Sequence, residues 1–141
     1  AGCATFEYLP SKAFNNLEYI KHREKRVYVL NGNVVIENEE KDGTNMEFKV
    51  SNIEESTVIE LPYIFYLGYT VEITNDSGET FRINNFESDN GFIAVNLPET
   101  ATNVNVKYEG TVLMKVSYII SFVTAIGLVV VIIDPRKNNN T

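Results

Sequence analysis

The stretch MEFKVS, residues 46–51, alternates apolar and polar side chains with a period of two. Successive side chains of a β-strand point to opposite faces of the sheet. This pattern therefore predicts a strand whose Met46, Phe48 and Val50 are buried and whose other side chains face water. The same alternation recurs in residues 71–74, 81–83 and 104–108. The soluble part of the chain is expected to consist of antiparallel strands, each with one wet face.

Turn-forming residues separate these runs. Each turn contains a glycine next to Asn, Asp or Ser, residues that tolerate left-handed backbone or hydrogen-bond their own backbone. The turn sequences are Asn31-Gly32, Lys41-Asp42-Gly43, Asp76-Ser77-Gly78 and Asn90-Gly91. The strands predicted between them are 27–30, 33–38, 45–51, 57–61, 69–74, 79–83, 91–95 and 103–109. This number and spacing of strands predict an antiparallel β-sandwich domain over residues 27–110.

Residues 1–26 depart from this pattern, and we interpret them as a lead-in to the sandwich. Within them Phe14, Leu17 and Ile20, with Tyr19 beside them, could form one side of a short helix. The basic segment KHREKR that follows is interpreted as a solvated loop. At the other end of the chain, residues 136–141 are rich in asparagine and are expected to form a disordered tail.

The eighteen residues from Val116 to Ile133 contain no charged side chain, and twelve of them are Val, Ile, Leu or Phe. As a helix this segment would be about 27 Å long, close to the roughly 30 Å hydrocarbon core of a bilayer. We predict a transmembrane helix within residues 111–135, the alternative being a buried strand or core helix. Small or hydroxyl-bearing residues share one of its faces, at Ser117, Ser121, Thr124 and Ala125. Such a stripe favours packing against other transmembrane helices, expected to belong to the same chain.

The composition argues against several classes of function. A formal net charge of −7 and a pI of about 4.7 disfavour nucleic acid as a partner, because its phosphates would be repelled. The chain has a single histidine, His22, and a single cysteine, Cys3, which cannot build a zinc site rich in these ligands. Neither a metal nor another cofactor is expected, and no nucleotide-binding or nucleophilic serine motif is present.

Carboxylate pairs are the remaining candidates for catalysis. Glu54 with Glu55, or Glu87 with Asp89, could in principle serve as the two acids of a glycosidase. Adjacent residues on a strand point to opposite faces, however, and acidic loops are usually only solvated. We therefore expect no catalytic residue in this chain.

The segment LPYIFYLGYTVEI, residues 61–73, concentrates aromatic residues around Gly68, which is expected to allow a turn or a bulge. Tyr63, Tyr66 and Tyr69 could stack on sugar rings, and they are our candidate glycan-binding residues. They could equally fill the core of the sandwich, which is the more common role for such side chains.

Three segments resemble the C-terminal portion of YfhO-type bacterial integral membrane proteins. They are EYLP (7–10), ELPYIFYLGYTVEI (60–73) and VNVKYEGTVLMKVSYIISFVT (104–124), in that order. Leu67 departs from the pattern, because a proline is expected there in the family. The resemblance covers most of the chain. It implies a long polytopic N-terminal part, then an extracytoplasmic β-rich domain and a final transmembrane helix.

The resemblance also implies a role in assembling glycans of the cell envelope, including glycosylation of lipoteichoic acid from lipid-linked sugars. The catalytic acids of the family would lie on outer loops of the N-terminal membrane part, which this sequence does not contain. The chain is therefore expected to be a non-catalytic accessory domain that could position a glycan acceptor. Its β domain would lie outside a bacterial cell membrane and its C-terminal tail in the cytoplasm.

Two other functions fit the sequence. One is a surface adhesion or structural module that a single span tethers to the membrane. The other is an autonomous glycoside-processing domain that uses the acidic loops. The sequence upstream of residue 1 would separate the first from the polytopic protein, because many apolar segments are expected there in one case and a single signal peptide in the other.

Overall fold

The computed structural model describes residues 9–133. The chain divides between Glu109 and Gly110 into two compact units. The first is a β domain and the second contains one long helix. Each unit is described by itself.

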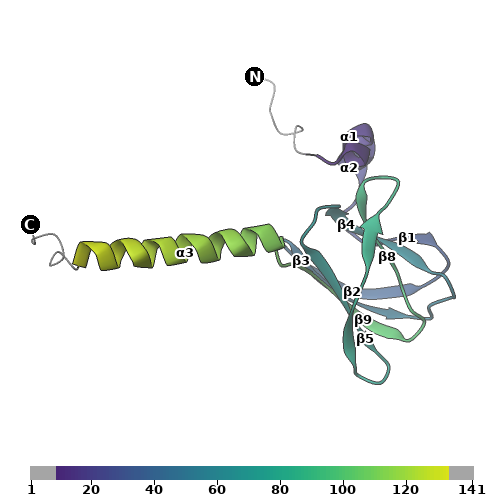
Figure 1. Cartoon of the computed structure of the whole chain (residues 1–141). Helices are drawn as coiled ribbons and strands as arrows, with labels where there is room; N and C mark the ends of the chain where they lie inside the picture. Colours follow the sequence, from purple (N-terminus) through teal and green to yellow (C-terminus); the bar gives the residue numbers. More distant parts are fainter. Residues whose placement is uncertain (1–8, 134–141) are drawn as a thin grey trace, which may run out of the picture. The chain divides into compact units, whose positions relative to one another are not determined.

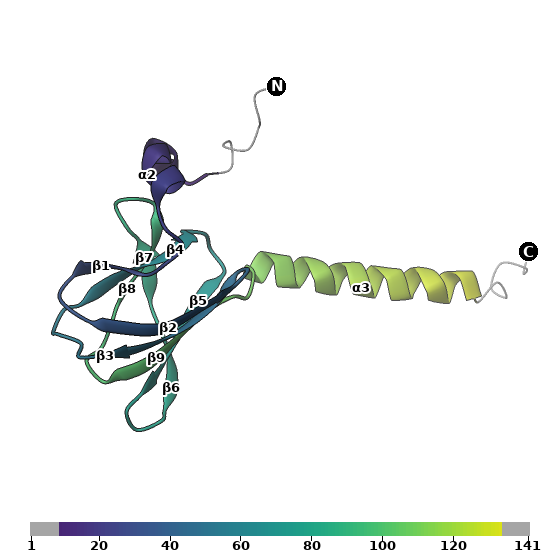
Figure 2. The same ribbon diagram turned by 180° about the vertical axis from the view of Figure 1, so that it is seen from behind.

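The β domain begins with two short helices, α1 (Ser11–Asn15) and α2 (Leu17–His22). Nine strands follow within the described residues: β1 (Tyr28–Asn31), β2 (Val35–Asp42), β3 (Asn45–Ser51), β4 (Val58–Ile64), β5 (Tyr69–Asn75), β6 (Thr80–Ile83), β7 (Asn85–Glu87), β8 (Phe92–Asn96) and β9 (Ala101–Tyr108). They form two antiparallel sheets, ordered β1-β4-β8-β7 and β2-β3-β9-β5-β6 (Figures 1 and 2). The predicted antiparallel β-sandwich is thus confirmed.

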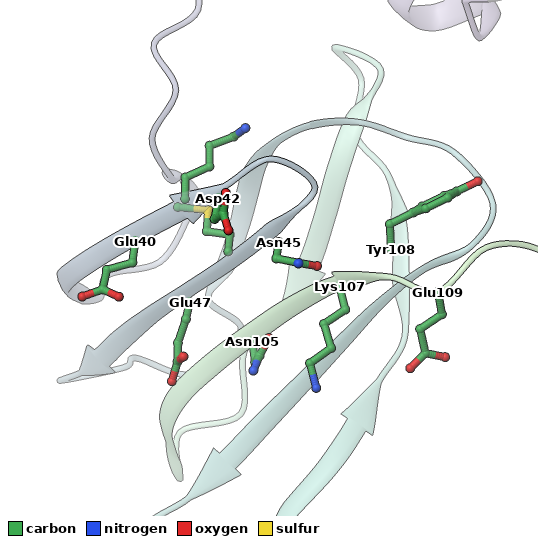
Figure 3. Close-up of a pocket in the computed structure, with 10 residues that line it drawn as sticks. Glu40, Asp42, Asn45, Glu47, Asn105, Lys107, Tyr108 and Glu109 are labelled. Atoms are coloured by element: carbon green, nitrogen blue, oxygen red, sulfur yellow. The ribbon is translucent and has the colours of Figure 1, made fainter.

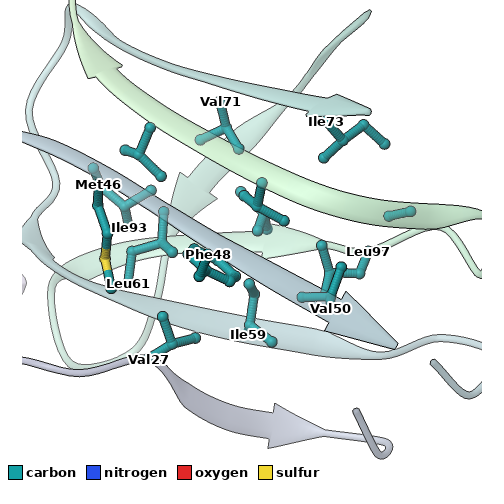
Figure 4. Close-up of a cluster of buried hydrophobic side chains, with 14 of the residues drawn as sticks. Val27, Met46, Phe48, Val50, Ile59, Leu61, Val71, Ile73, Ile93 and Leu97 are labelled. Carbon is teal, nitrogen blue, oxygen red and sulfur yellow. The ribbon is translucent and has the colours of Figure 1, made fainter. Parts of the chain in front are cut away.

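The two sheets enclose one apolar core (Figure 4). Strand β3 contains the MEFKVS stretch, and its Met46, Phe48 and Val50 are each at most 5% exposed, as the alternation predicts. Other strands of both sheets supply the facing side chains. These are chiefly Ile59, Leu61, Val71, Ile73, Ile93, Val95, Val104 and Val106. The period-two pattern therefore identifies the inward face of most strands.

Strand β4 extends to Ile64, three residues beyond the predicted end at Leu61. The extension includes Pro62, which cannot donate a backbone hydrogen bond and is therefore unusual inside a strand. Strand β1 pairs with β4 only as far as Glu60, so Pro62 has no partner strand on that side. Its missing N–H is therefore tolerated. The short strand β7 was not predicted, because its three residues carry no clear alternation.

The N-terminal segment forms two helices rather than the single short helix expected. Asn16 separates them, with φ −117° and ψ 35°. Of the residues predicted to form the packed side, Tyr19 packs edge-to-face on Phe92 of β8, with ring centroids 5.7 Å apart. Phe14, by contrast, is 52% exposed. Among residues 9–26, Ala13 is the fully buried one. The segment thus packs on the β domain through the small residue Ala13 and the aromatic residue Tyr19, rather than through one apolar helix face.

The second unit contains α3 (Val112–Ile133), which is long and apolar enough to cross a membrane. Taken by itself, this helix has no buried residue. The hydroxyls of Ser117 and Thr124 donate to the carbonyl oxygens of Leu113 and Ile120 within the same helix. These hydroxyls therefore need no partner on another helix, although the small-residue face stays available for packing. The predicted disordered tail, residues 136–141, and the last two residues of the predicted helix lie outside the described residues.

Candidate functional site

Tyr63 lies on β4 and points into the core, where it is only 7% exposed. Its hydroxyl donates to the backbone oxygen of Asn45 at 2.8 Å, and the ammonium of Lys41 lies 4.5 Å from the centre of its ring. Burial, which disfavours the phenolate, raises the pKa of Tyr63 to about 12. The sequence allowed either glycan stacking or core packing for Tyr63, and its burial corresponds to core packing.

Three tyrosine rings make contact at the end of the domain where β5 begins and β9 ends. Tyr69, the first residue of β5, packs against Tyr63 with ring centroids 5.2 Å apart. It also packs against Tyr108, the last residue of β9, with centroids 5.0 Å apart. Tyr69 and Tyr108 are directly opposite in the β5–β9 register. This tyrosine row, Tyr63–Tyr69–Tyr108, fixes the ring of Tyr69, and burial raises the pKa of that residue.

Tyr66 and Tyr69 line a hollow of about 360 Å³, which we call the tyrosine hollow. Tyr66 lies in the loop between β4 and β5 and is 39% exposed. Gly68 in the same loop has a φ of 107°, a conformation that favours glycine, and it provides the turn predicted there. Other lining residues include Ile20, Glu24, Lys25, Pro62, Ile64 and Phe92. Apolar and aromatic walls with a few charged groups are typical of small-ligand sites.

Arg23 also lines the tyrosine hollow, and its surroundings hold it in place. Its guanidinium lies 4.3 Å from the ring centre of Tyr28 and 4.7 Å from that of Phe92. Its Nε donates to Oε1 of Glu60 at 2.9 Å. Other nitrogens of the same guanidinium donate to the backbone oxygens of Glu24, Arg26 and Glu60. Because Glu60 neutralises Arg23, this wall suits a neutral ligand better than an anion.

Several donors converge on Glu60, whose side chain is fully buried on β4. The hydroxyl of Tyr19 donates to Oε1 at 2.7 Å, and Nδ2 of Asn90 donates to Oε2 at 3.2 Å. Burial is the largest influence and raises the pKa of Glu60. Hydrogen bonds from Ser88, Tyr19, Arg23 and Asn90 together outweigh it and hold that pKa below its usual range. Burial, and then the bond to Glu60, raises the pKa of Tyr19 to about 12.

A second, larger hollow of about 780 Å³ is formed by β2, β3 and the end of β9, and we call it the polar hollow. Figure 3 shows Glu47 of β3 and Asn105 and Lys107 of β9 pointing the same way from neighbouring strands. Tyr108 and Glu109 complete its lining at the end of β9. Carboxylate, amide and ammonium groups thus surround this hollow, in contrast to the tyrosine hollow.

Some charged groups of the polar hollow are paired with residues around it. Glu47 accepts from Asn103 at 2.8 Å, Lys107 donates to Glu72 at 3.1 Å, and Glu109 accepts from Arg82 at 2.7 Å. Four other lining side chains make no hydrogen bond or ion pair within residues 9–133. They are Glu40, Asp42, Asn45 and Asn105. These four are free to bind a ligand.

The two carboxylate pairs considered for catalysis lie elsewhere. Glu54 and Glu55 are both exposed in the turn that precedes β4. Asp89 is exposed, and its Oδ1 lies 3.9 Å from Nζ of Lys12. The Oε1 atom of Glu87 is buried without a hydrogen-bond partner among the described residues. Neither pair lines the tyrosine hollow or the polar hollow.

The structure thus brings together two of the three predicted glycan-binding residues. Tyr66 and Tyr69 share the tyrosine hollow, and Tyr63 packs behind Tyr69. Sequence reasoning missed Arg23 and Tyr108. Arg23 belongs to a basic segment interpreted as solvated, and the position of Tyr108 beside Tyr69 depends on strand order.

Comparisons with protein-family models, with curated proteins and with solved structures found no match to this chain. Any functional conclusion therefore depends on the residues and the geometry described above.

Proposed function

We propose that this chain is a non-catalytic accessory domain that binds a glycan acceptor and is anchored in a membrane by α3. It would form the end of a polytopic envelope glycosyltransferase of the YfhO type, with the β domain extracytoplasmic and the C-terminus cytoplasmic. The three segments that resemble that family support this proposal. So does a helix long and apolar enough to cross a membrane. The catalytic acids would then lie in another part of the protein.

The observation that carries the glycan-binding role is the pairing of Tyr66 and Tyr69 in one hollow. Sugar rings present apolar C–H faces, which pack on aromatic rings, and hydroxyls, which bind polar groups. Glu24 and Lys25 line the same hollow and could bind those hydroxyls. The volume of about 360 Å³ falls in the range of roughly 300–1,000 Å³ that is usual for small-molecule sites.

The walls of the tyrosine hollow are fixed before any ligand arrives. Arg23 is held between two rings and bonded to buried Glu60, and the tyrosine row holds Tyr69. A site fixed in this way loses little conformational entropy on binding. Tyr66, on the loop that contains Gly68, is the more exposed of the two lining tyrosines, and it should contribute most to stacking.

The test is direct binding by the full chain in detergent micelles. Fluorescence polarisation would be measured with labelled oligosaccharides of glucose, N-acetylglucosamine and galactose. We expect Tyr66→Ala to weaken binding about tenfold, which is about 1.4 kcal/mol, and Tyr66→Phe to retain most of it. Phe86→Ala is the matched control, because Phe86 is a similarly exposed aromatic residue that lines neither hollow. Absence of binding to all three sugars, or binding unchanged in Tyr66→Ala, would overturn the proposal.

The polytopic context needs a separate test, which is the hydropathy of the intact reading frame. Many apolar segments upstream of residue 1 would support the accessory role in a membrane glycosyltransferase. A single signal segment would instead support a tethered surface module, and the glycan site would then serve adhesion.

A further inference from the structure

We infer that Glu60 is a positioning residue for the tyrosine hollow, because its buried ion pair with Arg23 docks the N-terminal segment, which forms one wall of that hollow. Sugar binding and docking of this segment are then coupled, so that each strengthens the other. This inference rests on the proposed function of the tyrosine hollow. It adds a residue that touches no sugar and yet sets the affinity for it.

The walls of the tyrosine hollow come from two parts of the chain. The N-terminal segment supplies one wall, made of Ile20, Arg23, Glu24 and Lys25. Strands of the β domain and the loop that contains Tyr66 supply the rest. The hollow is therefore complete only while the N-terminal segment lies on the strands. A sugar that contacts both parts binds the docked state better than the undocked one, and such a difference in affinity couples binding to docking.

The N-terminal segment depends on docking for its own structure. Its two helices have five and six residues. An isolated helix in water is only marginally stable even at roughly 12–15 residues. Ala13 is the one fully buried residue among residues 9–26, so little apolar surface resists undocking. Segments with few buried apolar contacts open more readily than the strands of a core.

Glu60 holds the N-terminal segment through two of its side chains. The carboxylate accepts from Nε of Arg23 at 2.9 Å and from the hydroxyl of Tyr19 at 2.7 Å. Glu60 is not among the residues that line the hollow, and Arg23 is the lining residue that it fixes. Without the carboxylate, the docked state would keep the charge of Arg23 buried and uncompensated, whereas undocking would return that charge to water. Glu60 therefore controls docking without touching the sugar.

The experiment measures docking and affinity in the full chain in micelles. Docking is measured by hydrogen exchange at the backbone N–H groups of Ile20 and Arg23, which donate to the carbonyl oxygens of Asn16 and Tyr19. The probe is the unlabelled oligosaccharide of glucose, N-acetylglucosamine or galactose that binds most tightly. At about ten times its Kd it should slow this exchange about tenfold, because undocking then requires release of the sugar. Exchange at Gly78, in the turn between β5 and β6, should stay unchanged.

Glu60→Gln should weaken sugar binding by the factor by which it lowers the docked fraction, because only docked molecules carry the complete hollow. Glu72→Gln is the matched control, since Glu72 is a paired carboxylate of β5 that lines neither hollow. Near-ultraviolet circular dichroism would confirm that each variant is folded. If Glu60→Gln does not fold, Tyr19→Phe takes its place, because it removes one donor to Glu60 and keeps the ring that packs on Phe92.

The possible failures of the inference and of the proposed function differ. Exchange at Ile20 and Arg23 that the sugar leaves unchanged would overturn the inference and leave the proposed function standing. So would a variant with a lower docked fraction and unchanged affinity, or Glu60→Gln with an unchanged docked fraction. Absence of binding to all three sugars would overturn the proposed function itself.

Discussion

The Nε of Arg23 donates to Oε1 of Glu60 at 2.9 Å, and the two side chains are only 2% and 0% exposed. This buried ion pair connects the N-terminal segment to β4. A buried pair of charges often contributes little net stability, because both groups lose their hydration. Removing one partner is a different matter, since the other charge is then left buried and uncompensated. The pair should therefore determine whether the N-terminal segment stays docked.

We predict that Glu60→Gln and Arg23→Met each lower the free energy of unfolding by about 3–5 kcal/mol. The double variant Arg23→Met with Glu60→Gln should lose much less than the sum of the two single losses, because no charge is left unpaired. Thermal and urea unfolding of the full chain in micelles, followed by the near-ultraviolet signal of the tyrosines, would give these values. Glu72→Gln is the control, because Glu72 pairs with Lys107 and Arg82 on the surface. This substitution should lower the free energy of unfolding far less.

Additive losses in the double variant would contradict this reading of the pair. They would mean that each residue acts through packing alone, as expected if the rings of Tyr28 and Phe92 rather than Glu60 hold the guanidinium.

The pKa of Glu60 predicts a loss of stability in acid. Because this pKa is lower in the folded protein than its ordinary value of 4.5, folding favours the ionised carboxylate. The resulting stabilisation is fully present above pH 4.5 and is lost as the pH falls below that value. Unfolding measured from pH 7 down to pH 3 should show this decline, and Glu60→Gln should have a shallower one. An identical decline in the variant would show that other carboxylates, such as Glu72, account for the acid sensitivity.

The loss of stability at alkaline pH is predicted from the pKa values of Tyr19 and Tyr63. Folding raises the pKa of each from 10.0 to about 12, so the folded state favours the neutral phenols. Their contribution is complete below pH 10 and is lost as the pH rises through 12. Ultraviolet titration should show Tyr19 and Tyr63 among the tyrosines that ionise later than a free tyrosine. Tyr19→Phe should remove one of them, and a titration unchanged by that substitution would contradict the assignment.

Most of the fold could be predicted from the sequence because one face of each long strand is buried. The alternation in residues 46–51 and the glycine turns fix where strands lie and which way their side chains point. The pairing of strands is different, because it depends on contacts between distant residues. No local pattern indicates that β9 lies between β3 and β5, and only that order places Tyr108 beside Tyr69.

The candidate site could be predicted only in part for the same reason. Tyr66 and Tyr69 are close in sequence and were identified as a cluster. Arg23 was assigned to a solvated segment because its neighbours in sequence are charged. Its burial depends on Glu60, which lies 37 residues away and looks in the sequence like an ordinary polar residue within a strand. A buried ion pair between distant residues leaves no periodic signal.

Gly91 allows the N-terminal segment to lie close to the turn between β7 and β8. Its φ is +83°, and a Cβ placed on it would lie 2.6 Å from Cα of Ala13 and closer still to the backbone nitrogen. Gly78 has nearly the same φ, +81°, with nothing within 4 Å of such a Cβ. Gly78→Ala should therefore cost only the backbone strain of about 1–2 kcal/mol.

Gly91→Ala should cost distinctly more, because the backbone of Ala13 must also move. Hydrogen exchange of the full chain would show the difference as faster exchange in residues 11–22 for Gly91→Ala alone. Equal losses of stability in the two variants would mean that the close approach of Ala13 is not needed to hold the N-terminal segment.

The last prediction concerns α3 as a membrane span. Its 22 residues would be about 33 Å long, and Val123 lies near the middle, where a charge is costly. Val123→Lys should disfavour insertion by about 2.5–3.5 kcal/mol. Leu113→Lys should cost little, because a lysine near the helix end can reach the interface. Extraction of membranes with alkaline carbonate would compare the two variants. Equal retention in the membrane fraction would show that α3 does not cross the bilayer, because only a span places residue 123 in hydrocarbon and residue 113 near its edge.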